Sequence, residues 1–132
     1  MGSAEELAYL AARVLTCGIW IAAGLFKATH FQATVAEMAH HRIPWPRLVL
    51  PVVLALELVG SALLIVNLHL WAVALAWIAF MIPASFIYHW FVTENKIDFV
   101  QYVLFWKNVS IAGGLIALVL LDPSRPAWLL RG

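Results

Sequence analysis

The sequence predicts an all-α integral membrane protein, a four-helix bundle whose helices run up-down-up-down. Of its 132 residues, 64% are hydrophobic and only 11% are charged, whereas about a quarter of the residues of a soluble domain are charged. The chain also contains four apolar stretches, each about long enough to cross a ~30 Å hydrocarbon layer as a helix. Such a chain has too little polar surface to face water on every side, so it belongs in a lipid bilayer.

The four stretches form one domain over residues 1–132, and we expect membrane spans at about residues 7–26, 48–68, 70–92 and 97–121. A polar segment, Thr29 to Arg47, separates the first two spans. In it Phe31, Val35 and Met38 recur at helical spacing, which predicts a short amphipathic helix at the membrane interface. The Ile-Pro-Trp-Pro run at residues 43–46 ends this helix, because proline lacks a backbone donor and restrains the residue before it.

Glu57 is the only acidic or basic residue between Leu48 and Val92. A carboxyl group near the middle of a span is costly, so it should face protein or water and should have a partner. Counted along helices at ~1.5 Å per residue, Glu57 and Lys107 both lie about 15 Å in from the loop side, and Arg13 about 20 Å. We therefore predict a buried polar cluster in which Glu57 bridges Arg13 and Lys107. A structural role, in which the cluster only fixes helix register, accounts for the same pattern.

The predicted cluster carries a net charge of about +1 when all three groups are ionised, and an uncompensated cation in a low-dielectric bundle is costly. Either Lys107 is uncharged or an acceptor binds beside it. A quinone carbonyl or a small oxyanion would serve as that acceptor.

A group of aromatic residues and one histidine near this polar interior predicts a quinone headgroup site. It consists of Tyr88, His89, Trp90 and Trp106. The histidine would donate to a carbonyl oxygen and the aromatic rings would stack on the headgroup. Interfacial anchoring accounts for most of the seven tryptophans equally well.

Two further histidine patterns are weaker. Glu37 has the i, i+3 and i, i+4 spacing of some metal-binding helices to His40 and His41, but no second such pair exists. His30 and His89 end two different helices on one side, the minimum for a bis-histidine haem, without the small residues that a haem ring needs. We therefore predict no metal site, and no cofactor other than a bound quinone.

Several classes of protein are excluded. The net charge of +1 and the lack of a basic cluster argue against nucleic acid as a partner. Cys17 is the only cysteine, so it forms no internal disulfide and no cysteine metal site. The chain also lacks a nucleophile elbow, a phosphate-binding loop and a dinucleotide fingerprint.

Short motifs in all four spans make the chain resemble the DoxX family of small bacterial and archaeal membrane proteins. They are Arg13 with Gly-Leu-Phe-Lys at 24–27, Pro-Trp-Pro at 44–46, Glu-Leu-Val-Gly at 57–60, His89, Lys107-Asn108 and Gly-Gly at 113–114. The chain departs from the family pattern at Gly60-Ser61, where a pair of glycines is common, and in having no glycine before Pro44.

The resemblance implies a four-helix protein of the cytoplasmic membrane that takes part in membrane redox systems, similar to the membrane part of a thiosulfate:quinone oxidoreductase. Fold alone does not fix an activity, so it assigns no enzymatic reaction.

Three functions therefore remain as hypotheses. The first is a redox-associated membrane subunit that binds quinone at Arg13, Glu57, His89 and Lys107, with Asn108 in the same polar cluster and the electron-carrying cofactor in a partner subunit. The second is a non-catalytic accessory subunit that docks on a larger membrane complex through lipid-facing aromatics, namely Trp71, Trp77 and Trp106. The third is a small-solute carrier, which is disfavoured because four helices leave little room for a pathway.

Overall fold

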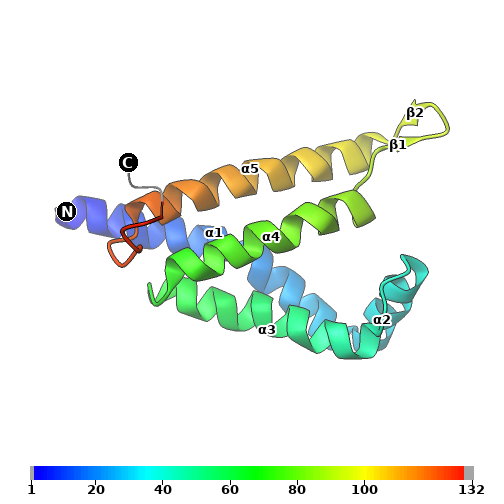
Figure 1. The fold of residues 1–132 in the computed structure, drawn as a ribbon, viewed down its shortest axis with the longest axis horizontal. Helices are drawn as coiled ribbons and strands as arrows, with labels where there is room; N and C mark the ends of the chain where they lie inside the picture. The colour runs from blue at the N-terminus through cyan, green and yellow to red at the C-terminus, as the bar shows by residue number, and fades with distance from the viewer. Residues whose placement is uncertain (1, 130–132) are drawn as a thin grey trace.

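A computed structural model describes residues 2–129 of the chain. Within this range the elements follow one another as five helices and one hairpin (Figure 1): α1 (Ser3–Thr29), α2 (Phe31–His40), α3 (Pro46–Ile65), α4 (Leu70–Tyr88), β1 (Val92–Thr93), β2 (Lys96–Ile97) and α5 (Phe99–Leu121).

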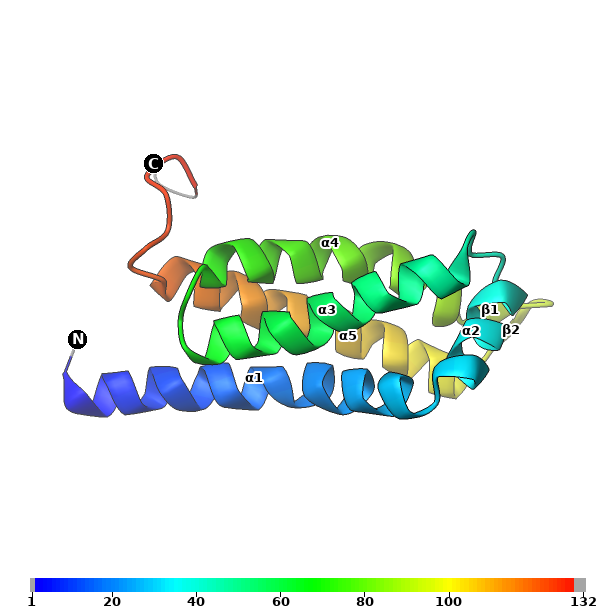
Figure 2. The ribbon, with the colours of Figure 1, turned by 90° about the horizontal axis from the view of Figure 1, so that it is seen from below.

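Four of the helices, α1, α3, α4 and α5, are long and apolar enough to cross a membrane. The start of α1 and the end of α5 lie at one end of the bundle, and α2 and the hairpin lie at the other (Figure 2). Successive long helices therefore run in opposite directions. The predicted four-helix, up-down-up-down membrane bundle is confirmed.

The helix boundaries differ from the predicted spans mainly at two places. Helix α1 is longer than the predicted 7–26, because Glu5 and Glu6 in its first turn and Lys27 in its last turn suit the helix dipole. Helix α4 stops at Tyr88 rather than near residue 92. The chain then forms a tight hairpin, in which Glu94 and Asn95 have φ of 48° and 62°, the left-handed values that a type I′ turn requires.

Helix α2 is the predicted amphipathic helix, but its apolar face packs on protein. Val35 and Met38 are buried in a small cluster with Leu50 of α3. The face that we expected to lie on the membrane surface is therefore covered by α3, because the chain turns back sharply at residues 41–45 and brings α2 beside the start of α3.

The helices are paired, with α1 packed most extensively on α3 and α4 on α5. The main core contains Cys17, Leu64, Trp77 and Leu115, all with no exposed surface, and it joins the two pairs toward the α3–α4 turn. From that turn, α3 and α4 diverge as they approach the end with α2 and the hairpin (Figure 1). The bundle is thus closed at one end and splayed at the other.

Two glycines allow the closest approaches between helices. A Cβ at Gly60 would lie 2.9 Å from Nε1 of Trp77 and 3.2 Å from the Val73 side chain, and a Cβ at Gly24 would lie 2.7 Å from Cδ2 of Leu58. Small residues at helix interfaces let backbones come close, and close packing drives helix association in lipid. Gly60 therefore fixes the α3–α4 contact and Gly24 the α1–α3 contact.

We expect Gly60→Ala to lower the free energy of unfolding by about 2 kcal/mol, the usual range for overpacking. Trp77 is fully buried and stacked on Trp20, so its ring cannot move away from a new Cβ at residue 60. Gly24→Ala should cost clearly less, because the branched end of Leu58 can change rotamer. Unfolding of the purified protein in mixed micelles compares the two variants, and equal losses would contradict this account of the packing.

Candidate ligand-binding site

A cavity of about 550 Å³ occupies the splayed half of the bundle. Side chains from α1, α2, α3, α4 and α5 line it, and most of them are apolar. Its polar lining residues lie in two groups. One is Lys27, Glu57, Lys107 and Asn108, and the other is Thr34, Glu37, Tyr88 and His89. An apolar pocket with a few convergent polar groups is the usual form of a ligand site.

The centre of the first group is an ion pair between α1 and α3. Nζ of Lys27 donates to Oε1 of Glu57 at 2.6 Å. The Glu57 side chain is only 2% exposed, whereas that of Lys27 is 29% exposed. Gly24, one turn before Lys27, lies against Leu58 and Glu57, so the close approach of the two helices brings the lysine within reach of the carboxylate.

The prediction that Glu57 bridges Arg13 and Lys107 is wrong. Nη1 of Arg13 donates instead to the Ile65 carbonyl at 2.6 Å, two turns along α3 from Glu57, and Arg13 borders a separate polar recess at the closed end with Tyr9 and Asn67. The depth estimates assumed that α1 and α3 end at the same level on the loop side. They do not, because α3 extends past the end of α1 to pack against α2.

Lys107 and Asn108 of α5 do line the cavity together with Glu57. Nδ2 of Asn108 donates to Oγ of Ser85 at 2.9 Å, which fixes the amide between α4 and α5. Among residues 2–129, no side chain forms an ion pair with Lys107. Of the four residues predicted to form the polar cluster, three therefore share one cavity, and Lys27 takes the place predicted for Arg13.

Trp20 forms part of the inner wall of the cavity, and Trp77 lies behind it. The rings of Trp20 and Trp77 stack with centroids 4.2 Å apart, and Nε1 of Trp77 donates to the Leu56 carbonyl at 2.9 Å. Trp20 lines the cavity and is 5% exposed. Within residues 2–129 its own indole N–H has no hydrogen-bond partner. The interpretation of Trp77 as a lipid-facing docking residue is wrong, because it is completely buried.

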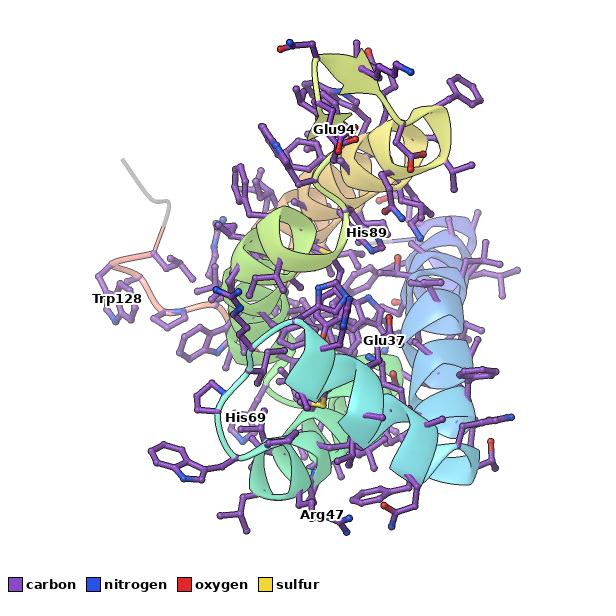
Figure 3. All side chains as sticks on the ribbon, turned by 90° about the vertical axis from the view of Figure 1, so that its right-hand side faces the viewer. Glu37, Arg47, His69, His89, Glu94 and Trp128 are labelled. Atoms are coloured by element: carbon purple, nitrogen blue, oxygen red, sulfur yellow. The ribbon has the colours of Figure 1, made fainter. Side chains whose placement is uncertain are left out.

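The second polar group lies at the end of the cavity nearest α2. Figure 3 shows Glu37 and His89 near the centre of this end of the bundle, whereas Arg47 lies at its edge. Nδ1 of His89 pairs with Oε1 of Gln101 at 2.9 Å, and the ring of His41 lies 4.4 Å from that of Tyr88. Tyr88 and His89, two members of the predicted quinone site, thus border the cavity.

Trp106, the third member of that predicted site, lies elsewhere. It is 48% exposed and packs against Tyr102 and Phe105 on the outer side of α5, and it does not line the cavity. Trp90 belongs to the same outer aromatic surface, through Phe86 and Phe105.

The remaining histidine patterns are dispersed in the structure. His30 is exposed, with its ring stacked on Phe26 at 4.1 Å, and it does not border the cavity as His89 does. In the described part of the chain, no three histidine, cysteine, aspartate or glutamate side chains gather as a metal site would require.

The cavity carries both a donor and an acceptor besides the Lys27–Glu57 pair, because Lys107 and Glu37 border it and neither forms an ion pair among residues 2–129. The carboxylate of Glu57 is engaged by Lys27, while the Lys107 ammonium and the Trp20 N–H have no protein acceptor among residues 2–129. Lys107 is an exposed residue that borders the cavity, so its ammonium group is available to a ligand with acceptor atoms, whereas the Trp20 N–H is buried from the cavity as well as from solvent.

The sequence offered a faint signal for the two residues that it missed. Lys27 lies one turn after Gly24, yet as the last residue of an apolar span it resembles an ordinary interfacial anchor. Trp20 lies one turn after Cys17 on the same face of α1, but nothing in the sequence distinguishes its free N–H from that of the other tryptophans.

The four long apolar helices define a small polytopic membrane protein, and a cavity occupies one half of its bundle. The chain matches the family DoxX over residues 8–90, and it belongs to that family. It is 29% identical over 124 residues to the inner membrane protein YphA of Escherichia coli K12, covering 92% of this chain and 88% of that protein. It is 28% identical over 123 residues to the inner membrane protein YqjF of the same organism, covering 93% and 90%. No solved structure matches the chain. The protein is thus an integral protein of the cytoplasmic (inner) membrane, in contact with the lipid bilayer, as predicted.

Proposed function

We propose that this protein binds a quinone in the cavity of its splayed half and serves a membrane redox system as a quinone-linked subunit. The observation that carries the proposal is that two lysines, Lys27 and Lys107, border the cavity and only Lys27 pairs with Glu57 among residues 2–129. A quinone ring presents two carbonyl acceptors and no donor, so one carbonyl oxygen can accept a hydrogen bond from the Lys107 ammonium.

The apolar lining supports a quinone over a small oxyanion. A sulfur or phosphorus oxyanion would need several charged or polar contacts around it, whereas most of the side chains that line the cavity are apolar. A flat quinone ring gains from contact with aromatic side chains, and Trp20 and Phe80 border the same space. When bound, the quinone would supply the two-electron chemistry. The chain's own residues would bind it, orient it and keep water away from it.

We expect Lys107→Met to weaken quinone binding about tenfold or more, because a charge-assisted hydrogen bond to a carbonyl oxygen is lost. The probe is dimethoxy-methyl-benzoquinone, the tail-free ubiquinone headgroup, with menadione as a second headgroup. Binding is followed in lipid nanodiscs by saturable quenching of tryptophan fluorescence.

Two further variants sharpen this test. Lys96→Met removes a lysine of the exposed hairpin that is not part of the cavity, so it should leave the affinity unchanged. Trp20→Phe keeps an aromatic ring and removes only a buried N–H, so it should weaken binding clearly less than Lys107→Met does. If neither headgroup binds the wild-type protein saturably, or if Lys96→Met and Lys107→Met act alike, the quinone proposal is overturned.

A second candidate function is that of a non-catalytic accessory subunit of a larger membrane complex. The observation that favours it is the exposed aromatic surface at the hairpin end of α4 and α5, formed by Phe86, Trp90, Tyr102 and Trp106. Aromatic residues are enriched in the centres of protein interfaces, although they also anchor helices at the membrane–water boundary. Protein that carries no quinone and that copurifies with a large complex, with Lys107 intact or replaced, would favour this function.

A further inference from the structure

We infer that the ligand of the cavity is a long-tailed, membrane-resident molecule whose tail leaves the protein sideways, between α3 and α4, into the bilayer. This inference rests on the proposed function and adds the class of quinone, one with an isoprenoid tail. The argument starts from how polar and apolar side chains are divided among the walls of the cavity.

The wall between α1 and α5 carries polar groups that are suited to a ligand headgroup. Lys27 comes from α1, and Lys107 and Asn108 come from α5. The end beneath α2 is polar as well, with Thr34 and Glu37. An apolar tail placed along either of these surfaces would desolvate polar groups without pairing them, which is unfavourable.

The wall between α3 and α4 is different, because its side chains are apolar except for Glu57, on the side of the closed end, and Tyr88, which lies against His41 after α2. Val49 and Val53 of α3 face the cavity, as do Pro83, Ala84 and Ile87 of α4. The stretch of wall between these two polar residues is chemically suited to hydrocarbon and offers nothing to a polar headgroup.

The packing of α3 and α4 shows why this wall is open. The two helices meet where Gly60 lies against Val73 and Trp77, near their shared turn. On the cavity side of that contact they diverge (Figure 1), and Val53 and Ala84 face the cavity. Ile87 borders the cavity and is 43% exposed, so the apolar wall continues to the outer surface of the bundle.

The length of the helices places this opening at lipid depth. Val53 lies seven residues after Pro46, the first residue of α3, or about 10 Å along the helix axis. A ligand that diffuses in the bilayer can therefore enter with its headgroup and leave its tail among the acyl chains. A water-soluble ligand has no apolar tail to place in an apolar opening that faces lipid.

The test narrows the opening between α3 and α4 and leaves the polar residues of α1 and α5 unchanged. Val53→Trp adds an indole to the apolar wall, and it should weaken binding of ubiquinone with a long isoprenoid tail by about tenfold while leaving the tail-free headgroup almost unaffected. Val52→Trp is the matched control, since Val52 is the neighbouring residue on α3, is 68% exposed and does not line the cavity. Both ligands are titrated in nanodiscs by fluorescence quenching.

A second measurement uses the wild-type protein and so does not depend on the variant folding. Ubiquinone that carries a diazirine in the middle of its tail is photolysed in nanodiscs, and the labelled residues are located by mass spectrometry. Labels on residues 49–53 and 83–87, removed by competing unlabelled ubiquinone, support the inference.

The outcomes separate the two proposals. If the headgroup binds but Val53→Trp weakens both ligands equally, or the label falls on α1 and α5, the lateral exit is wrong and quinone binding stands. If neither ligand binds the wild-type protein, the proposed function fails and the exit fails with it.

Discussion

Replacing Lys27 with methionine should lower the free energy of unfolding by about 3 kcal/mol, because breaking a buried ion pair leaves the other charge without a partner. The charge left behind is that of Glu57, whose side chain is 2% exposed and whose Oε1 lies 2.6 Å from Nζ of Lys27. Methionine keeps most of the length of the lysine side chain and removes its charge, so the loss reports mainly the charge.

The two halves of the pair should differ in what their removal costs. Glu57→Gln leaves the Lys27 ammonium, and that side chain is 29% exposed, so it can recover part of its hydration. We expect this variant to lose only about 1 kcal/mol, in the range of a single neutral hydrogen bond. The double variant Lys27→Met with Glu57→Gln should lose less than Lys27→Met alone, because it no longer contains a buried unpaired carboxylate.

A double-mutant cycle measured by unfolding in mixed micelles checks this assignment. The coupling energy between Lys27→Met and Glu57→Gln should be about 2 kcal/mol, and that between Lys107→Met and Glu57→Gln close to zero. If Lys107 shows the larger coupling, the ion pair of this structure is not the one that operates in the membrane, and the original prediction of a Glu57–Lys107 contact is restored.

This ion pair also shows how far sequence reasoning reaches. The hydropathy pattern was sufficient for the four membrane helices, for α2 and for the need of Glu57 to have a partner, because the cost of a lone carboxyl in lipid does not depend on tertiary detail. Which base supplies the partner depends on the relative sliding of α1 and α3 along each other. That offset is fixed by contacts such as Gly24 on Leu58 and Arg13 on the Ile65 carbonyl, which periodicity does not encode.

The residues of the candidate site also fall into those that the sequence could predict and those that it could not. Lys107, Asn108, Tyr88 and His89 were selected from the sequence because polar residues within spans tend to face the bundle interior, and they border the cavity. Trp106 was selected as one of the aromatic residues near the polar interior. It follows Phe105 and precedes Lys107, and because adjacent residues on a helix point in different directions, its ring lies on the outer surface while Lys107 borders the cavity. Trp20 gave only the faint signal of sharing a helix face with Cys17, since the absence of an acceptor for its N–H is a property of the assembled structure.

Trp77 carries the second large effect that we expect, and it separates the two views of the aromatic residues. In the accessory-subunit hypothesis Trp77 faces lipid, and its replacement by alanine would cost little stability. In the structure Trp77 has no exposed surface, stacks on Trp20 and donates to the Leu56 carbonyl. Trp77→Ala should therefore lower the free energy of unfolding by about 3 kcal/mol, at the lower end for a large buried side chain.

The lower end is appropriate because the unfolded reference state lies in lipid. There the loss comes from van der Waals contacts and from the extra hydrogen bond to the Leu56 carbonyl, which keeps its partner within α3, and not from transfer of the ring out of water. Trp106→Ala, at a half-exposed position on α5, is the matched control and should change stability by less than about 0.5 kcal/mol.

Trp77→Ala also tests the ligand site, since the ring of Trp77 is stacked on that of Trp20. Trp77→Phe retains a ring for Trp20 to stack on and gives up the bond to Leu56, so it should lose about 1 kcal/mol of stability and little quinone affinity. Trp77→Ala removes the ring on which Trp20 stacks, so it should lower both the stability of the protein and its affinity for quinone. Equal stability losses for Trp77→Ala and Trp106→Ala would mean that the α1–α4 contact beneath the cavity is not formed as described. The inner wall on which the quinone proposal depends would then be absent.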